Sequence, residues 1–454
     1  MVAFIVAVFI LGYLCIALES VFKINKAAPA LLMCVLCWVL YMFDAGHFLN
    51  LFHGEEFQAF LAGTHNPESA EQNFVSRILL EHMGDTCEIL FFLMGAMTIV
   101  EIVDANGGFN FVRDTLQTTS KRKLLWRITF MTFVLSALLD NLTTSIVMVM
   151  VLRKLVNDKQ DRMLYAGMII IAANSGGAFS PIGDVTTIML WIRGMITTQG
   201  VITEVFLPSL VSVVIPVLIL QFRLKGDLPR PVVAKSGDAL HFSKAERNIV
   251  FFLGVGGLVF VPIFRLLTGL PPFMGILLVL GLLWMTTEVF YRNKNVDHSM
   301  QRRVTHLLTR IDMSTILFFL GILMAVASLQ ETGVLTAFGK TLNDVSGGNH
   351  YLVTGVIGAV SSIVDNVPLV AGCMGMYEIA PAGDFAVDGM FWQLLAYCAG
   401  VGGSMLIIGS AAGVVVMGLE KISFGWYLKH ISWIALAGYL AGIAWYALEE
   451  LIGM

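Results

Sequence analysis

Apolar runs of about 20 residues recur through this sequence, and they constrain its fold more than any other feature. A helix needs about 20 predominantly apolar residues to cross the hydrocarbon core of a bilayer. The composition agrees, because only 13% of the residues are charged, against about 25% in a soluble domain. Runs close to the required length lie at 2–22, 28–44, 86–105, 203–222, 249–267, 273–291, 312–329 and 424–447. The sequence therefore predicts an all-α polytopic membrane protein.

Charge and cysteine content exclude several other classes of protein. The formal net charge is −4, and no basic run is interleaved with aromatic residues, so we expect no nucleic-acid partner. All 6 cysteines lie in apolar segments, which argues against a disulfide framework.

Four further apolar segments are interrupted. An Asp-Asn pair breaks two of them: Asp140-Asn141 lies within 124–152, and Asp365-Asn366 lies within 351–380. Glycine, serine and proline interrupt the other two, 163–196 and 391–418. We therefore expect two broken transmembrane helices at 163–196 and 391–418.

Positive charge indicates which ends of these segments face the cytoplasm. Segment 124–152 is basic on both sides, with Arg113, Lys121, Arg122 and Lys123 before it and Arg153, Lys154, Lys159 and Arg162 after it. A single spanning helix cannot have two cytoplasmic ends. The segment is therefore predicted to be a re-entrant hairpin that enters from the inside, with Asp140-Asn141 at its tip.

Segment 351–380 has the opposite flanks. Its neighbours are mainly acidic: Asp344, Asp384 and Asp388, with Lys340 the nearby cation. We expect a second re-entrant hairpin that enters from the outside. Two other loops are assigned to the cytoplasm by Arg223, Lys225, Arg230, Lys235, Lys244, Arg247, Arg292, Lys294, Arg302, Arg303 and Arg310. Both termini then lie on the periplasmic side of a bacterial inner membrane, since no transit segment is recognised.

The two halves of the chain resemble each other. Ser136-Ala-Leu-Leu-Asp140-Asn141 matches Ser361-Ser-Ile-Val-Asp365-Asn366, and the segment around Gly183-Asp184 matches that around Gly409-Ser410. With the charge pattern, this predicts an inverted repeat, an arrangement found in secondary transporters. The expected organisation is an N-terminal scaffold and outer loop (1–77), a first repeat (78–222), cytoplasmic loops with two scaffold spans (223–311) and a second repeat (312–454). The first repeat holds the inner hairpin and broken helix 163–196, and the second holds the outer hairpin and broken helix 391–418.

Polar side chains gather at the interruptions. An Asp deep in a bilayer costs about 2.5–3.5 kcal/mol on insertion scales, and such residues also cap helices that restart after a break. The functional interpretation is an oxygen-rich cation site, since hard cations prefer oxygen ligands. A buried carboxyl group could then hold either a proton or sodium, which couples the two fluxes. Sodium is expected at Asp140, Asn141, Asp184 and Asp365, and the wider ion-binding or proton-coupling set adds Ser136, Thr143, Thr144, Asn174, Ser180, Ser361, Asn366 and Ser404.

Other titratable residues are weaker candidates. Glu88 and Glu101 precede the first hairpin and could relay protons, although Glu88 could equally be interfacial. His47, His53, His65 and His82 are expected to be solvated in or beside the outer loop, with an external pH sensor as the alternative. No histidine lies within any interruption, so an enzyme is not expected, and neither is a cofactor.

These motifs resemble the NhaD-type sodium/proton antiporters, within a superfamily that includes arsenite permeases and dicarboxylate symporters. The likeness covers nearly the whole chain, and its most particular stretches are Glu88 to Glu101 and the opening Ala17-Leu-Glu19 with Lys23 to Ala28. The resemblance implies exchange of sodium or lithium for protons, a homodimer, and an elevator-like movement. It implies an ion-binding role for Asp140, Asn141, Thr143, Asp184, Asp365 and Asn366. Ser410 replaces an acid in the second half, so the two halves are not equivalent. The alternative function is a permease for arsenite or a dicarboxylate.

Overall fold

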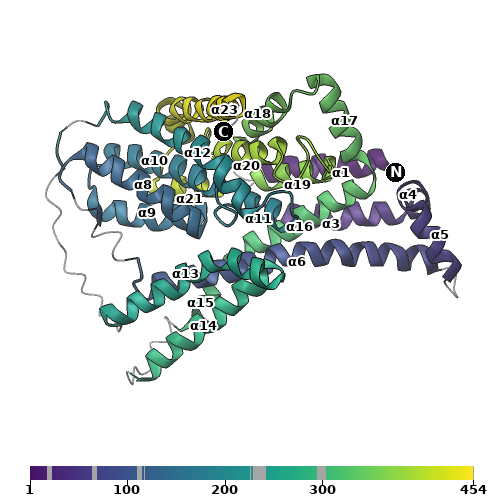
Figure 1. Cartoon of the computed structure of the whole chain (residues 1–454), viewed down its shortest axis with the longest axis horizontal. Coiled ribbons are helices and arrows are strands. Elements are labelled where there is room, and N and C mark those ends of the chain that lie inside the picture. Colours follow the sequence, from purple (N-terminus) through teal and green to yellow (C-terminus); the bar gives the residue numbers. More distant parts are fainter. Residues whose placement is uncertain are drawn as a thin grey trace. The chain divides into compact units, whose positions relative to one another are not determined.

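A computed structural model describes residues 1–17, 23–63, 69–109, 115–116, 118–224, 226–228, 242–293, 303–363 and 365–452. Within these ranges the chain folds into helices (Figure 1), with one isolated β-bridge between Ser120 and Asp227. The described residues confirm the prediction of an all-α protein. Outside them lie Glu19, His65, Arg113, Lys225, Arg230, Lys235, Lys294 and Arg302, on which parts of the predicted topology and family motif depend.

The helices of the described residues lie between Val2 and Ile452. Their bounds are α1 Val2–Ala17, α3 Ala27–Met42, α4 Ala45–Phe52, α5 Gly54–Gly63, α6 Ala70–Ala105, α8 Lys121–Leu139, α9 Asn141–Leu155, α10 Lys159–Ala178, α11 Val185–Ile192, α12 Thr198–Leu220, α13 Lys244–Thr268, α14 Pro272–Asn293, α15 Val304–Leu307, α16 Met313–Glu331, α17 Val334–Ser346, α18 His350–Ser361, α19 Asn366–Met376, α20 Met390–Gly402, α21 Ala411–Glu420, α22 Phe424–Tyr427 and α23 Trp433–Ile452.

Six helices in the described part of the chain are long and apolar enough to cross a membrane. They are α6, α12, α13, α14, α16 and the run from Phe424 to Ile452, which includes a short π-helical segment at Leu428–Ser432. A seventh span is counted if α3 and α4, which meet at a bend of 82°, cross together. The protein is therefore a multi-pass membrane protein.

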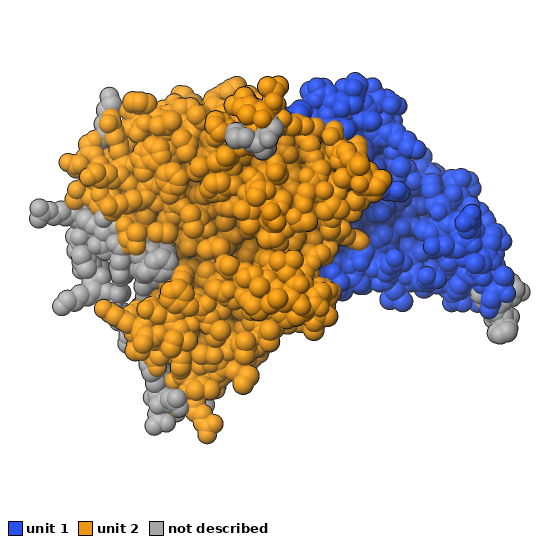
Figure 2. All heavy atoms as spheres, viewed as in Figure 1, with its two compact units in different colours: residues 1–91, 312–353, 367–378 blue, residues 92–311, 354–366, 379–454 orange. Residues whose placement is uncertain are grey.

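The helices group into two compact units, coloured separately in Figure 2. Unit 1 comprises residues 1–91, 312–353 and 367–378, and unit 2 comprises residues 92–311, 354–366 and 379–454. In unit 1, α3 packs against α16 closely enough that a Cβ atom on Gly321 would lie 2.6 Å from the backbone carbon of Ala30. In unit 2, α10 packs against α8, α9, α12 and α20.

Helix α6 is longer than the sequence suggested. The predicted span began at residue 86, after the outer loop that closes region 1–77, whereas α6 already starts at Ala70 and is preceded by α4 and α5. Its first turns bury Phe74, Val75 and Ile78 on one face. Charged residues on the opposite face lower the average hydropathy there, so the helical pattern was not recognised.

Two histidines that were expected to be solvated are paired in unit 1. The Nε2 atom of His53 lies 2.6 Å from one carboxylate oxygen of Glu331, and the Nε2 atom of His82 lies 2.8 Å from the other. Only 12% of the His82 side chain is exposed. An ionised Glu331 can only accept hydrogen bonds, so this pairing requires a proton on each Nε2 atom. The prediction of solvated loop histidines is therefore wrong for His53 and His82.

In unit 2 the helices stop at the interruptions identified in the sequence. Helix α8 ends at Leu139 and α9 begins at Asn141, while α10 ends at Ala178 and α11 begins at Val185. In the second half of the chain, the corresponding gaps lie between α18 and α19 and between α20 and α21. Each gap leaves backbone groups of both helix ends to be satisfied by side chains or by neighbouring segments.

Matching glycines bring the backbone close together in both halves. A Cβ atom on Gly176 of α10 would overlap the carbonyl oxygen of Phe133 on α8, and one on Gly402 of α20 would overlap the carbonyl oxygen of Gly358 on α18. Phe133 and Gly358 each lie three residues before the serine that opens the motif shared by the two halves. The same backbone contact therefore occurs at equivalent positions in the two halves.

Candidate functional site

The first turn of the site is built by Asp140. This residue lies between α8 and α9 with a backbone φ of +113°, a conformation that residues other than glycine rarely adopt. One carboxylate oxygen accepts the backbone N–H of Thr143 at 2.7 Å and the other accepts its hydroxyl at 2.7 Å. Asp140 is thus the N-cap of α9, and the cap holds the strained turn that puts Asn141 at the start of the helix.

Asp184 occupies the same position at the start of α11, and only 1% of it is exposed. Its Oδ1 atom accepts the backbone N–H and the hydroxyl of Thr186, both at 3.0 Å. The positive end of a helix stabilises an acceptor at this position. That arrangement uses one carboxylate oxygen and leaves the other facing the rest of the site.

Asparagines from both Asp-Asn pairs converge on Asp184. The Nδ2 atom of Asn141 donates to its Oδ2 atom at 2.8 Å, and the Nδ2 atom of Asn366 lies 3.4 Å from both carboxylate oxygens. Asn141 and Asn366 are 7% and 5% exposed. Two segments separated by more than 200 residues therefore meet at one buried carboxylate.

The second half of the chain has a serine hydroxyl at the position where the first half has the carboxylate of Asp184. Ser410 caps α21, as Asp184 caps α11, and accepts the backbone N–H of Gly413 at 3.2 Å. It also accepts the Nδ2 atom of Asn174 at 3.0 Å, while Asn174 Oδ1 accepts Asn141 at 3.2 Å. One chain of hydrogen bonds thus joins Ser410, Asn174, Asn141 and Asp184.

Three carboxylates lie near one another in segments that have no basic residues. Asp184 is within electrostatic range of both Asp140 and Asp365, and Asp365 is half-buried beside Asn366. No Lys, Arg or His occurs in residues 136–144, 174–187, 361–368 or 401–413. The site is therefore negatively charged unless a proton or a cation neutralises it.

The serines assigned to the site donate hydrogen bonds to backbone carbonyls and not to one another. Ser136 donates to the carbonyl of Ala173 at 2.6 Å, and Ser361 donates to that of Ala399 at 2.9 Å. These two bonds again link equivalent positions of the two halves. Ser180 and Ser404 also donate to backbone carbonyls, those of Ala137 and Val401, each at 2.6 Å. The carbonyls of Ala137, Ala399 and Val401 lie in the last turn of their helices, where carbonyls lack an intrahelical partner.

Two adjacent hydroxyls on α9 have no hydrogen-bond partner among the described residues. They belong to Thr144 and Ser145, and both side chains are fully buried. Buried hydroxyls without a partner are uncommon, and each calls for an explanation such as a water or an ion. Ser145 was not identified from the sequence, although its place directly after Thr143 and Thr144 could have indicated it.

The two glutamates proposed as proton relays both lie on α6. Glu101 pairs with Arg310, its Oε1 atom lying 3.1 Å from Nη1, and 31% of its side chain is exposed. Glu88 is half-buried on the part of α6 that belongs to unit 1. Glu101 is therefore part of an ion pair, and Glu88 belongs to a different unit from Asp184.

Comparison of the sequence with known proteins shows which family the chain belongs to. Sodium/proton antiporter 1 of Arabidopsis thaliana is 45% identical over 441 residues, which cover 96% of this chain and 70% of that protein. Sodium/proton antiporter 2 of the same plant is 42% identical over 444 residues, covering 96% and 97%. The Na(+)/H(+) antiporter NhaD of Halomonas elongata is 29% identical over 466 residues, covering 96% and 86%. This chain belongs to the NhaD-type sodium/proton antiporters.

A family model also matches most of the chain. The sequence model of the family described as citrate transporter matches residues 13–395. That range includes Asp140, Asp184 and Asp365 and ends before Ser404 and Ser410. Both descriptions are of transporters rather than enzymes, and both agree with a multi-pass helical fold.

Proposed function

We propose that this protein exchanges sodium, or lithium, for protons across the membrane. One observation carries the proposal: Asp184 is buried and receives an asparagine from each Asp-Asn pair, and the segments that form the site contain no Lys, Arg or His. A buried, unneutralised carboxylate is costly. A proton or a small cation removes that cost, and only one of them can occupy the carboxylate at a time.

The exchange follows from competition for the carboxylate. With a proton bound, Asp184 is neutral and its remaining acceptor positions are satisfied by Asn141, Asn366 and Thr186. With sodium bound, the carboxylate is a ligand, and oxygen ligands complete the shell. The expected ligands are the carboxylates of Asp140 and Asp365, the hydroxyls of Thr144 and Ser145, and backbone carbonyls next to the helix breaks.

Asn141 and Asn366 could serve the site in two side-chain orientations, one without sodium and one with sodium bound. Their amide groups present a donor to the carboxylate here, and half a turn about the terminal bond would present the oxygen instead. We propose that Asn141 and Asn366 donate to Asp184 in the sodium-free state and turn their Oδ1 atoms toward a bound cation. The same side chains would then serve both states without movement of the backbone.

The proposed architecture is an inverted repeat of two re-entrant hairpins, α8–α9 from the inside and α18–α19 from the outside, and two broken helices. It is supported by the matching glycine contacts and by the matching bonds of Ser136 and Ser361. Both termini would lie outside the cytoplasm of a bacterial cell. The family resemblance adds a homodimer in the inner membrane and an elevator-like movement, with no resident cofactor.

Contacts between the halves support movement as one body. Arg153 near the end of α9 and Arg162 near the start of α10 both bind Glu420 at the end of α21, at 2.7 and 2.6 Å. Near the start of α20, Asp388 accepts the backbone N–H and hydroxyl of Thr197, both at 2.6 Å. Each contact joins the start of one broken helix to the end of the other.

A second candidate is a permease for a citrate-like anion, which the family match favours. The N-termini of α11 and α21 are positions where anions bind well. At α11, however, the carboxylate of Asp184 already occupies that position. An added anion would face Asp140, Asp184 and Asp365 without a basic residue, so we favour the cation. Arsenite and dicarboxylate transport are alternatives of the same class.

Everted membrane vesicles test the proposed function. Sodium or lithium added to vesicles with an established proton gradient should dissipate it, because cation entry would be coupled to proton exit. Vesicles without the protein are the control, and citrate added in place of sodium tests the second candidate. A gradient that responds to neither cation from neutral to alkaline pH would reject the exchange function.

Cysteine labelling tests the proposed topology in a background that lacks the native cysteines. Exposed positions flank each hairpin: Arg122 and Lys159 around the first, Asp344 and Ala382 around the second. Cysteines at 122 and 159 should both react from the cytoplasm, and those at 344 and 382 should both react from outside. If the two flanks of either hairpin reacted from opposite sides, that segment would be a spanning helix rather than re-entrant.

A further inference from the structure

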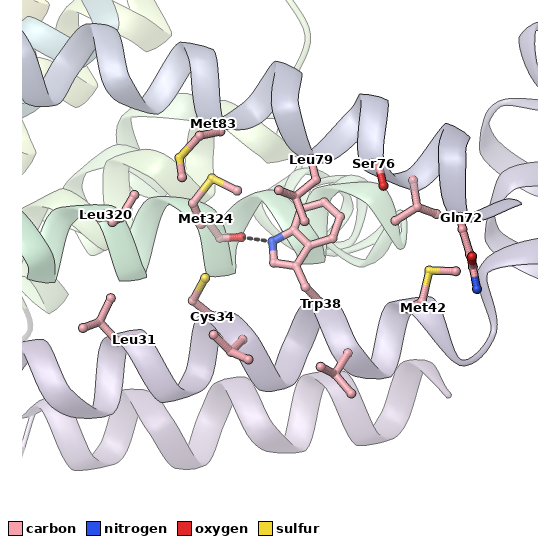
Figure 3. A pocket seen from close by; sticks show the side chains of 13 residues that line it. Leu31, Cys34, Trp38, Met42, Gln72, Ser76, Leu79, Met83, Leu320 and Met324 are labelled. Carbon is pink, nitrogen blue, oxygen red and sulfur yellow. Dashed lines mark hydrogen bonds between the residues drawn. The ribbon is translucent and has the colours of Figure 1, made fainter. Parts of the chain in front are cut away.

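The apolar pocket that Figure 3 shows in unit 1, between α3, α6 and α16, lacks the chemistry to respond to a cation. Its volume is about 630 Å³, and its lining residues include no carboxylate and no basic side chain. None of them belongs to unit 2, which contains Asp184. Groups that can respond to a cation at Asp184 lie in the hydrogen-bond chain of unit 2, which runs from Asp184 through Asn141 and Asn174 to Ser410.

Each hydrogen bond in this chain has a direction. The Nδ2 atom of Asn141 donates to Asp184 at 2.8 Å and to the Oδ1 atom of Asn174 at 3.2 Å. Asn174 is fully buried, and its own Nδ2 atom donates to the hydroxyl oxygen of Ser410 at 3.0 Å. That oxygen also accepts the backbone N–H of Gly413 at 3.2 Å. Because a hydroxyl has two acceptor positions and one proton, Ser410 uses both acceptor positions here and needs its proton for neither bond.

Asn141 cannot turn its oxygen toward a cation without affecting Asn174. After such a turn, the Oδ1 atom of Asn141 takes the place of its Nδ2 atom, about 3.2 Å from the Oδ1 atom of Asn174. Two buried carbonyl oxygens would then face each other with no proton between them, which is unfavourable. If Asn174 turns as well, its Nδ2 atom donates to Asn141 and the conflict is removed.

The turn of Asn174 changes what Ser410 must do. It places the Oδ1 atom of Asn174 beside the hydroxyl, which can donate its proton there while its oxygen still accepts the N–H of Gly413. A carboxylate at this position could only accept a hydrogen bond, so it would hold Asn174 in the orientation seen here. Asp184 is such a carboxylate at the equivalent position of the first half. The difference between the two halves therefore has a physical reason.

We propose that Asn174 and Ser410 are positioning residues that turn together with Asn141 when sodium replaces the proton at Asp184. Ser410 is a hydroxyl because it accepts a hydrogen bond from Asn174 in one orientation and donates one to it in the other. Through this relay, a cation at the start of α11 in the first half changes the hydrogen bonding at the start of α21 in the second half. The inference rests on the proposed function, since it requires sodium to bind beside Asp184.

Sodium binding to the purified full-length protein in detergent tests the relay. The measurement is the rise of the thermal unfolding midpoint with sodium concentration at alkaline pH, which reports an apparent dissociation constant and does not require transport. Ser410→Asp keeps a good N-cap residue for α21 but cannot donate to Asn174. It should therefore weaken sodium binding, although its added negative charge alone would strengthen the binding of a cation.

Asn174→Ala separates the relay from the added charge. In this background Ser410→Asp acts through its charge alone, so the cycle of single and double variants isolates the relay. Ser410→Asp should weaken sodium binding about tenfold more when Asn174 is present, the effect expected for one unsatisfied buried hydrogen-bonding group. Equal effects in the two backgrounds, or tighter sodium binding by Ser410→Asp, would overturn the proposal.

Ser423→Asp is the matched control for the acid substitution. Ser423 caps α22 at an exposed position and accepts the backbone N–H of Trp426 at 3.3 Å, so this variant should bind sodium as the parent protein does. If Ser410→Asp does not fold, Asn174→Asp provides the test, because it can only accept and would hold Asn141 in its donating orientation. Its sodium binding should also be weaker, and tighter binding would contradict the relay. A parent protein that neither sodium nor lithium stabilises would reject the proposed function itself.

Discussion

Asp184→Asn is expected to reduce sodium-dependent proton exchange to the background of vesicles without the protein. The substitution keeps the size of the side chain and removes its charge. Asn141 and Asn366 would then face an amide with one acceptor oxygen in place of two, and the site would lose the buried group for which a proton and sodium compete. The measurement is the sodium-induced recovery of a proton-gradient dye in everted vesicles.

Asp158→Asn is the matched control for this substitution. Asp158 caps α10 at an exposed position and accepts the backbone N–H of Asp161 at 2.8 Å. Asparagine caps helices as well as aspartate does, so exchange should stay near that of the parent protein. Substantial exchange by the Asp184→Asn protein at normal membrane levels would move the coupling group elsewhere.

Glu420→Gln is expected to cause a larger loss of stability than any substitution of an exposed charge. The Glu420 side chain is fully buried and binds both Arg153 and Arg162. Removing one member of a buried ion pair costs about 3–5 kcal/mol. Because 43% of the Arg153 and 21% of the Arg162 side chain is exposed, water compensates part of their charge, and the loss should fall toward the lower end of that range. The midpoint of thermal unfolding in one detergent should fall clearly below that of the parent protein.

Glu101→Gln provides the comparison for Glu420→Gln. Glu101 pairs with Arg310, but 31% of the glutamate and 47% of the arginine side chain are exposed. Exposed pairs contribute about 0–1 kcal/mol, so this midpoint should change little. Equal midpoints for the two variants would show that Glu420 does not hold α9, α10 and α21 together.

The sequence determined the positions of the helix breaks. An Asp-Asn pair within an apolar segment costs too much to lie passively in lipid, and Asp is a preferred N-cap. These local preferences are sufficient to end α8 at Leu139 and to start α9 at Asn141, and likewise to start α11 after Asp184. The family motifs are also contiguous along the chain, so the order of the residues alone is enough to indicate the family.

Tertiary structure alone decided which of these polar groups meet. Sequence treated Asp140, Asp184 and Asp365 as equal candidates, whereas the fold makes Asp184 the acceptor shared by Asn141 and Asn366. The pairing of His53 and His82 with Glu331 was missed for the same reason, since Glu331 is 249 residues beyond His82. Periodicity and capping report on neighbours along one helix, while contacts between distant segments depend on how whole helices pack.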